Sequence, residues 1–187
     1  MENHCNITFT REIPLRYETD VFIAGGGPAG VAAALAAAYN GASVYLAEGL
    51  SCFGGAGTAG LVPAFMQFTN GVDFLAGGIG QKILNKLRAE GGNDPHKGIS
   101  IKVEVLKRVY DELMLESGVN FTFHTQLIGV ETEGGKISRV ILSSKSGIFA
   151  AKAKIYIDCT GDGDLAAWAG APFEKGNEEG VMMAGTL

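Results

Sequence analysis

The sequence predicts an α/β domain in which a central parallel sheet is combined with an antiparallel β-meander. A strand, a helix and a second strand follow one another between Val21 and Ala47, and strands joined in this way are parallel. After residue 120 apolar residues alternate with polar ones, which indicates the strands of a meander. A last apolar run, Ile155 to Ile157, leads into a turn of glycines and carboxylates and then an Ala-rich helix.

The composition is typical of one globular domain. The chain has 187 residues, of which 47% are hydrophobic and 19% are charged, enough for a single domain with its own core. The formal net charge is −5 and Lys and Arg form no cluster, so nucleic-acid binding is not expected. The 28 glycines gather in clusters, which mark turns and places of close backbone approach.

The cysteines and the N-terminal sequence bear on metal sites and on location. Cys5, Cys52 and Cys159 are widely spaced and form no Cys-x-x-Cys motif, which argues against a disulfide framework and a structural metal site. The first residues lack the apolar core of a signal peptide. The uncharged stretch from Val21 to Ala47 has glycines and a proline in its middle, so it fits a strand and helix better than a membrane span. We therefore expect a cytoplasmic protein with no membrane partner.

The first elements form a βαβ unit. Val21 to Ala24 is the first strand. Pro28 begins a helix that ends near Tyr39, and Asn40-Gly41 closes it, because Pro is favoured at the first helical position and Gly just after the last. Ser43 to Ala47 is the second strand, which should lie parallel to the first.

The turn of this unit has the spacing of a dinucleotide-binding motif. Gly25, Gly27 and Gly30 form G-x-G-x-x-G, in which the three glycines permit a tight turn, a close pyrophosphate and close helix packing, respectively. Glu48 ends the second strand, where a carboxylate can accept hydrogen bonds from the ribose hydroxyls. No Arg follows it that could bind a 2′-phosphate. The competing interpretation is a glycine turn with an incidental surface Glu.

The middle of the chain is less regular. We expect residues 1–19 to be a tail or an edge segment and residues 20–187 to form the domain, with an irregular and helical piece inserted at about 60–118. Within that piece helices are predicted from Ile79 to Glu90 and from about Ile101 to Glu116, because their apolar residues keep helical spacing.

The predicted meander follows that piece. Its strands hold Phe121 and Phe123, then Leu127 to Val130, Ile137 to Leu142 and Ile148 to Ala153, with turns at Glu133-Gly134-Gly135 and Ser146-Gly147. The chain then returns to the buried strand that begins at Ile155.

The acidic turn after this strand could bind a divalent cation or could be a tight strand-to-helix turn beside a ligand. Asp158, Asp162 and Gly163 fall at the first, fifth and sixth positions of an EF-hand loop. However, Thr160 stands at the third position and Ala169 stands where a bidentate Glu is needed. A strand also precedes the turn where an EF-hand has a helix. We therefore expect no metal and favour the turn beside a ligand.

Three motifs in order resemble a known family. The chain reads DVFIAGGGPAG at its first turn, LAEGLSCFGGAGTAG after the second strand and IDCTGDGDLAAWAG after the meander. These are similar to the FAD-dependent oxidoreductases of the glutathione-reductase-like flavoprotein superfamily, whose closest subgroup reads VERxxxLGGxxTAG and IDATGDGDLAARAG. The resemblance covers nearly the whole chain from Asp20. It implies FAD as cofactor and an FAD/NAD(P)-binding fold of three layers, ββα.

The resemblance also implies roles for individual residues. Gly54, Gly55 and Thr58 would line the pyrophosphate and flavin side, Gly161 would give the adenosine end clearance, and Leu127 would meet the adenine through its backbone. The expected cofactor-binding residues are Gly25, Gly27, Pro28, Ala29, Gly30, Glu48, Gly54, Gly55, Thr58, Leu127, Thr160 and Gly161.

Other residues near these motifs receive structural interpretations. Asp162 and Asp164 are expected to cap the following helix. The chain departs from the family pattern at Cys159, which replaces Ala, and at Trp168, which replaces Arg. Cys159 and Cys52 could be redox thiols, but we expect both to be structural, Cys159 as a small apolar filler.

The resulting functional expectation is an FAD-dependent oxidoreductase that transfers hydride or electrons between the flavin and a small organic substrate, with a homo-oligomer allowed. A non-catalytic dinucleotide-binding module and an NAD-dependent dehydrogenase are the alternatives. No residue is assigned as a catalytic base. The resemblance further implies that the chain is the N-terminal part of a longer flavoprotein, ending before the C-terminal segment that closes over FAD.

Overall fold

The computed structural model describes residues 8, 10–65, 68–94 and 100–181. Along the chain, the elements are β1 (Leu15–Ala24), α1 (Pro28–Tyr39), β2 (Val44–Ala47), the short 3₁₀ helix η1 (Gly55–Gly57), α2 (Ile79–Ala89), α3 (Val103–Glu116), β3 (Asn120–Thr122), β4 (Gln126–Glu133), β5 (Lys136–Ser144), β6 (Gly147–Asp158) and α4 (Asp164–Trp168). In the described residues no helix is long and apolar enough to cross a membrane.

The six strands of the described residues form one sheet, in the order β3-β2-β1-β6-β5-β4. β1 is at its centre and pairs in parallel with β2 on one side and with β6 on the other, where Val21 is opposite Val44 and Ile155. β4, β5 and β6 are joined by antiparallel pairing. The predicted α/β class, with a parallel sheet and an antiparallel meander, is confirmed.

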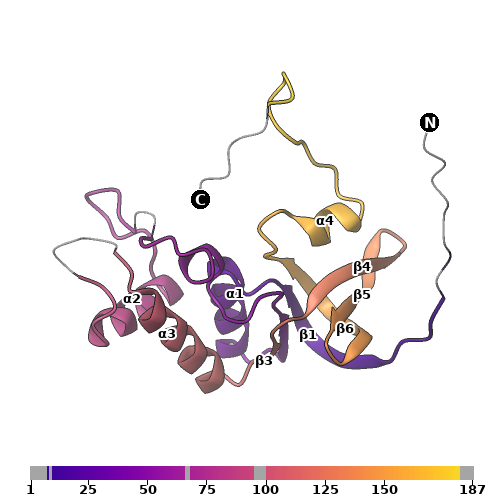
Figure 1. Ribbon diagram of the computed structural model, residues 1–187, viewed down its shortest axis with the longest axis horizontal. Helices are drawn as coiled ribbons and strands as arrows, with labels where there is room; N and C mark the ends of the chain where they lie inside the picture. Colours follow the sequence, from indigo (N-terminus) through magenta and orange to yellow (C-terminus); the bar gives the residue numbers. More distant parts are fainter. Residues whose placement is uncertain (1–7, 9, 66–67, 95–99, 182–187) are drawn as a thin grey trace.

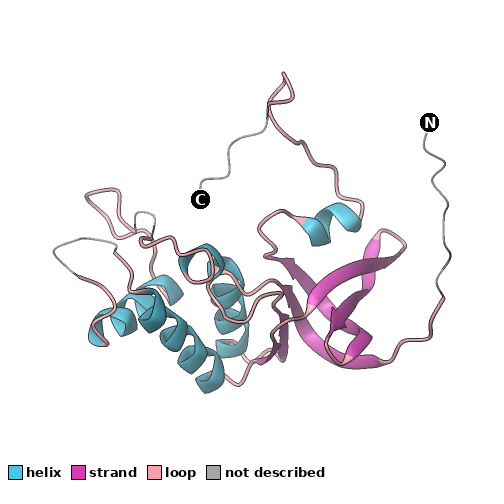
Figure 2. Cartoon of the chain, viewed as in Figure 1, coloured by secondary structure: helices cyan, strands magenta, loops and turns pink. Residues whose placement is uncertain are grey.

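Alternation along β1 and β2 gives the parallel sheet two apolar faces. Val21, Ile23, Val44 and Leu46 face a core formed with α1, α2 and α3, whereas Phe22 and Tyr45 face a second core formed with the meander and α4. Figures 1 and 2 show the three long helices on one side of β1 and the β4–β6 strands with α4 on the other. The three layers are therefore helices, parallel sheet and meander, as the ββα description predicts.

Two details of the strand prediction are wrong. The segment around Phe121 is not part of the meander: β3 pairs in parallel with β2 at the far edge of the sheet, where Phe121 and Phe123 pack against Phe53 with ring centroids 4.9 and 4.7 Å away. The apolar runs near residues 150 and 156 are also one strand, β6, because it pairs with β1 from Ala150 to Asp158. For the same reason β1 begins at Leu15, before the predicted Val21.

Candidate functional site

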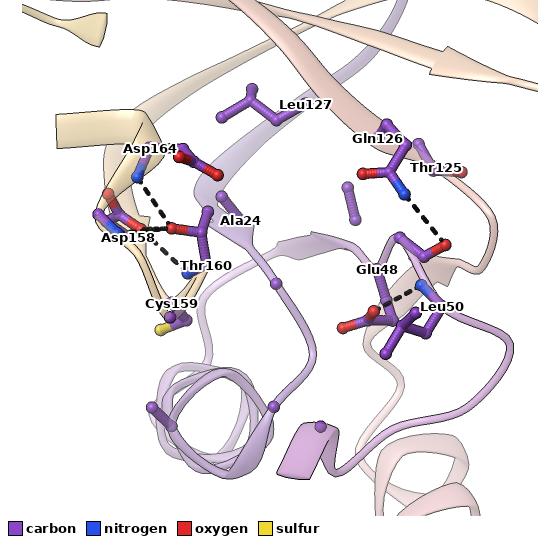
Figure 3. A pocket seen from close by; sticks show the side chains of 18 of the residues that line it. Ala24, Glu48, Leu50, Thr125, Gln126, Leu127, Asp158, Cys159, Thr160 and Asp164 are labelled. Carbon is purple, nitrogen blue, oxygen red and sulfur yellow. Dashed lines mark hydrogen bonds between the residues drawn. The ribbon is translucent and has the colours of Figure 1, made fainter. Parts of the chain in front are cut away.

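A cavity of about 780 Å³ lies at the carboxyl ends of the central parallel strands. Ala24 of β1, Ala47 of β2 and Asp158 of β6 form its floor. The chain leaves β1 toward β2 on one side and returns as β6 on the other, so the cavity lies at a switch point of the sheet, where ligands of open α/β folds bind. Figure 3 shows the α1 end, the turn after β6, and the residues before and after the start of β4 around this space.

In the first glycine loop, which runs from Gly25 to Gly30, nearby backbone atoms leave no room for a side chain at two of the three motif glycines. A Cβ on Gly25 would overlap the carbonyl oxygen of Cys159, and one on Gly30 would overlap the carbonyl oxygen of Gly25. Gly25 also has a φ of +95°, a conformation that favours glycine. Gly27 is different, because no heavy atom lies within 4 Å of its added Cβ. The first and third glycines thus serve packing, and the second leaves open space on the cavity side.

The N-terminus of α1 faces this open space. Gly27 is the N-cap, and no side chain caps the helix, while Gly27, Pro28 and Ala29 line the cavity. The first N–H groups of a helix have no partner within the helix and carry its positive dipole end. The geometry is therefore suited to an anion such as a pyrophosphate.

Glu48 presents a fixed carboxylate to the cavity. The residue is buried, with 6% of its surface exposed. Oε2 accepts a hydrogen bond from the backbone N–H of Gly26 at 2.5 Å, and Oε1 accepts one from the N–H of Leu50 at 2.6 Å. These bonds tie the end of β2 to the first glycine loop, and the remaining lone pairs can accept hydroxyl donors.

The second glycine loop approaches the first. The N–H of Gly54 donates to the carbonyl of Gly26 at 2.8 Å, and an added Cβ on Gly55 would lie 3.3 Å from Cα of Gly27. Gly55 lines the cavity. Thr58 is fully buried and donates its hydroxyl to the carbonyl of Phe53 at 2.5 Å. It therefore supports this loop from behind.

The acidic turn after β6 is held by Asp158 and Thr160. Oδ1 of Asp158 accepts from the backbone N–H and the hydroxyl of Thr160 at 3.0 and 2.8 Å, and Oδ2 accepts from the N–H of Ala166 at 2.8 Å. The Thr160 hydroxyl oxygen accepts from the N–H groups of Gly163 and Asp164, both at 3.0 Å. Burial raises the pKa of Asp158, but the hydrogen bonds from Thr160 and Ala166 outweigh it and hold this pKa below its usual value.

The prediction that Asp162 and Asp164 cap α4 is therefore wrong. The N-cap is Gly163, and no side chain of that residue pair caps the helix. Asp158 takes the role because the left-handed residues Gly161 and Gly163, with φ of +93° and +76°, fold the turn back over the end of β6.

The two cysteines within the described residues are free. Cys159 lines the cavity and packs against the helix-side core, and burial raises the pKa of its thiol, with the Asp158 carboxylate adding to the effect. The Sγ of Cys52 lies 3.8 Å from the hydroxyl oxygen of Thr58. A raised thiol pKa disfavours the reactive thiolate, in keeping with a structural Cys159.

The cavity brings together most of the predicted cofactor-binding residues. Those that line it are Gly25, Gly27, Pro28, Ala29, Glu48, Gly55, Leu127, Thr160 and Gly161. Gly30, Gly54 and Thr58 are buried behind it. Sequence reasoning missed Leu50, Thr125, Gln126, Asp158 and Asp164 as lining residues, although each lies within two positions of a predicted one or inside the quoted turn.

The charged side chains of the described residues that line the cavity are all acidic: Glu48, Asp158 and Asp164. No group of three or more potential metal ligands was found among the His, Cys, Asp and Glu residues that the structure describes. A bound anion must therefore be held by backbone N–H groups and the α1 dipole.

A glycine-rich βαβ turn, an open helix N-terminus and a carboxylate at the end of the second strand together define a dinucleotide-binding protein. The sequence model of the FAD dependent oxidoreductase family matches residues 20–185, so the chain belongs to this family, whose cofactor is FAD. A search of curated proteins found no match to the chain.

Three solved structures are similar to this chain in fold. A geranylgeranyl bacteriochlorophyll reductase-like protein from Thermoplasma acidophilum has a TM-score of 0.57 and 20% identity, covering 82% of this chain and 42% of its own. THI4 from Thermovibrio ammonificans has a TM-score of 0.58 and 20% identity, covering 81% and 61%. L-proline dehydrogenase from P. horikoshii has a TM-score of 0.59 and 14% identity, covering 83% and 57%. The chain spans less than two thirds of the length of each.

Proposed function

We propose that the chain is the FAD-binding part of an oxidoreductase that exchanges hydride or electrons between the flavin and a small organic substrate. The observation that carries the proposal is the open backbone at Gly27, which faces the cavity at the uncapped N-terminus of α1. FAD supplies the redox chemistry when bound. The protein's part is to hold the cofactor, orient it and exclude water.

Each lining residue then has a role along the dinucleotide. The pyrophosphate would lie over Gly27, Pro28 and Ala29, with Gly55 close by, because helix N–H groups point there. The ribose hydroxyls would bind Glu48. Leu127 would border the adenine, and Thr160 would lie opposite Glu48 (Figure 3). Gly161 follows Thr160 in the turn and also lines the cavity.

The organisation proposed for the chain is a single FAD-binding domain over residues 20–187, preceded by the short segment 1–19, whose last residues, from Leu15, already belong to β1. The piece at about 60–118 is proposed to be an insertion that carries α2 and α3, both of which pack on the helix-side core. We also propose a cytoplasmic location, which the free thiols of Cys52 and Cys159 favour.

Identification of the cofactor tests the proposal. The purified protein should carry, or take up, a yellow chromophore that is released on denaturation and is FAD by mass. A reductant should bleach it in the native protein. Release of NAD in place of FAD would favour a nicotinamide-dependent dehydrogenase. A bound flavin that reductants and substrates leave unchanged would favour a non-catalytic module.

A further inference from the structure

Gln126 is a cavity residue with no role in the functions proposed so far. It is the first residue of β4, its side chain is exposed, and it lines the cavity between Thr125 and Leu127. Its Nε2 donates to the carbonyl of Gly49 at 3.4 Å. Figure 3 shows the carboxamide on the same side of the cavity as Glu48.

Gly49 makes room for this carboxamide. A Cβ on Gly49 would lie 2.6 Å from Nε2 and 2.9 Å from Oε1 of Gln126, closer than real Cβ atoms approach other groups. Gly49 has no positive φ, so its backbone conformation does not require glycine. The carboxamide of Gln126 therefore lies directly against Gly49, beside the ribose-binding position proposed for Glu48, and a side chain at position 49 would displace it.

The backbone around Gln126 is firmly placed, but its side chain is not. The N–H of Thr125 donates to the carbonyl of Glu48 at 2.9 Å, and the N–H of His124 donates to the carbonyl of Leu50 at 3.0 Å. The side-chain bond to Gly49, in contrast, is longer than the usual 2.7–3.2 Å and exposed. In the part of the chain that the structure describes, Oε1 accepts no hydrogen bond.

We propose that Gln126 determines specificity for the adenosine half of the cofactor, through a hydrogen bond that Oε1 accepts from the adenine amino group or from the ribose 2′-hydroxyl. The inference rests on the proposed function. A carboxamide suits this position because it offers an acceptor without adding a fourth negative charge to a cavity lined by Glu48, Asp158 and Asp164.

The test is to measure the dissociation constants of ADP, inosine diphosphate and 2′-deoxy-ADP by calorimetry for the wild-type protein, Gln126→Ala and Gln126→Met. Inosine diphosphate lacks the amino group and 2′-deoxy-ADP lacks a hydroxyl. Methionine keeps the length of the side chain and removes its acceptor. Both substitutions should weaken ADP binding about tenfold but leave unchanged the binding of the analogue that lacks the donor.

The outcomes separate this inference from the proposed function. Equal weakening of all three nucleotides, unchanged ADP affinity, or wild-type affinity in Gln126→Met would overturn the role of Oε1 while leaving the proposed function standing. A wild-type protein that binds neither ADP nor FAD would overturn both. Gly49→Ala supplies an independent check. It should weaken ADP binding as much as Gln126→Ala does, and the double variant should bind ADP no more weakly than either single variant.

Discussion

Gly27 is the one glycine of the G-x-G-x-x-G motif whose missing side chain leaves open space. Gly27→Val should therefore fold normally and lose cofactor binding, because a branched side chain would fill the position proposed for the pyrophosphate. The measurements are the melting temperature and the flavin content after incubation with FAD.

Gly30→Val is the matched control. Its Cβ would overlap the carbonyl oxygen of Gly25, so this variant should lower the melting temperature even without ligand. Wild-type flavin content in Gly27→Val would contradict the placement of the pyrophosphate.

Glu48 combines a structural and a ligand-binding role. Its carboxylate accepts from the N–H groups of Gly26 and Leu50. Glu48→Ala should weaken FAD binding by about 1.5–3 kcal/mol, roughly ten- to a hundredfold, because charge-assisted hydrogen bonds to the ribose are lost. It should also lower stability in the absence of FAD, since two backbone N–H groups, one of them buried, lose their acceptor.

Glu48→Gln separates the two roles, because an amide keeps one acceptor oxygen and loses the charge. We expect an intermediate loss of FAD affinity, measured by fluorescence titration. If Glu48→Ala bound FAD with unchanged affinity, the ribose would have to lie elsewhere.

At the scale of elements, the junction between β6 and α4 depends on Asp158. Asp158→Ala should destabilise the protein by about 1.5–3 kcal/mol, since a charged acceptor of backbone N–H groups is removed. Asp164→Asn is the control and should leave the denaturation midpoint unchanged, because in this turn the Asp164 backbone N–H forms the bond to Thr160.

The same junction gives a pH dependence of stability. The folded-state pKa of Asp158 lies below its usual value, so its contribution is present at neutral pH and is lost as the pH falls below about 4, through the folded-state pKa. The free energy of unfolding of the wild-type protein should therefore converge with that of Asp158→Ala in acid. A difference in the free energy of unfolding that stays constant with pH would contradict the stabilising role of the ionised Asp158 carboxylate.

The elements that could be predicted from the sequence are those with local signals. The helix from Pro28 to Tyr39 matches its prediction at both ends, because Pro begins it and Asn40-Gly41 closes it. The partner of β3 could not be predicted: alternation identifies the buried face of a strand but not its neighbour, and the pairing with β2 spans a crossover that contains α2 and α3.

The same distinction between local and long-range signals applies to the site. Gly25, Gly27 and Glu48 belong to one local pattern, and all three line the cavity; that they bind the cofactor stays a prediction. Asp158 accepts a hydrogen bond from the N–H of Ala166, eight residues later in the chain. This contact depends on how the intervening turn folds, so no local pattern predicts it. The sequence also could not show that Thr58 is buried and donates to the carbonyl of Phe53 instead of facing the cavity, because the glycines around it give no signal of burial.

At the scale of the whole molecule, the negative charge of the protein repels the negatively charged cofactor. The chain has a formal net charge of −5, the charged side chains of the described residues lining the cavity are all carboxylates, and the FAD pyrophosphate is itself negative. Salt screens repulsion between such charges, since the Debye length falls from about 30 Å at 10 mM to about 8 Å at 150 mM. We therefore expect FAD to bind more tightly as NaCl rises from about 10 to about 150 mM.

This salt effect should depend on the cavity carboxylates themselves. Asp164→Asn leaves the acceptors of the β6–α4 junction in place and removes one negative charge from the wall, so it should bind FAD more tightly at low salt and respond less to added NaCl. Titration of both proteins at several salt concentrations, with the ratio of their dissociation constants plotted against ionic strength, measures the effect. If FAD affinity fell with salt in the wild-type protein, attraction by the N-terminus of α1 and the backbone N–H groups would outweigh the repulsion from Glu48, Asp158 and Asp164.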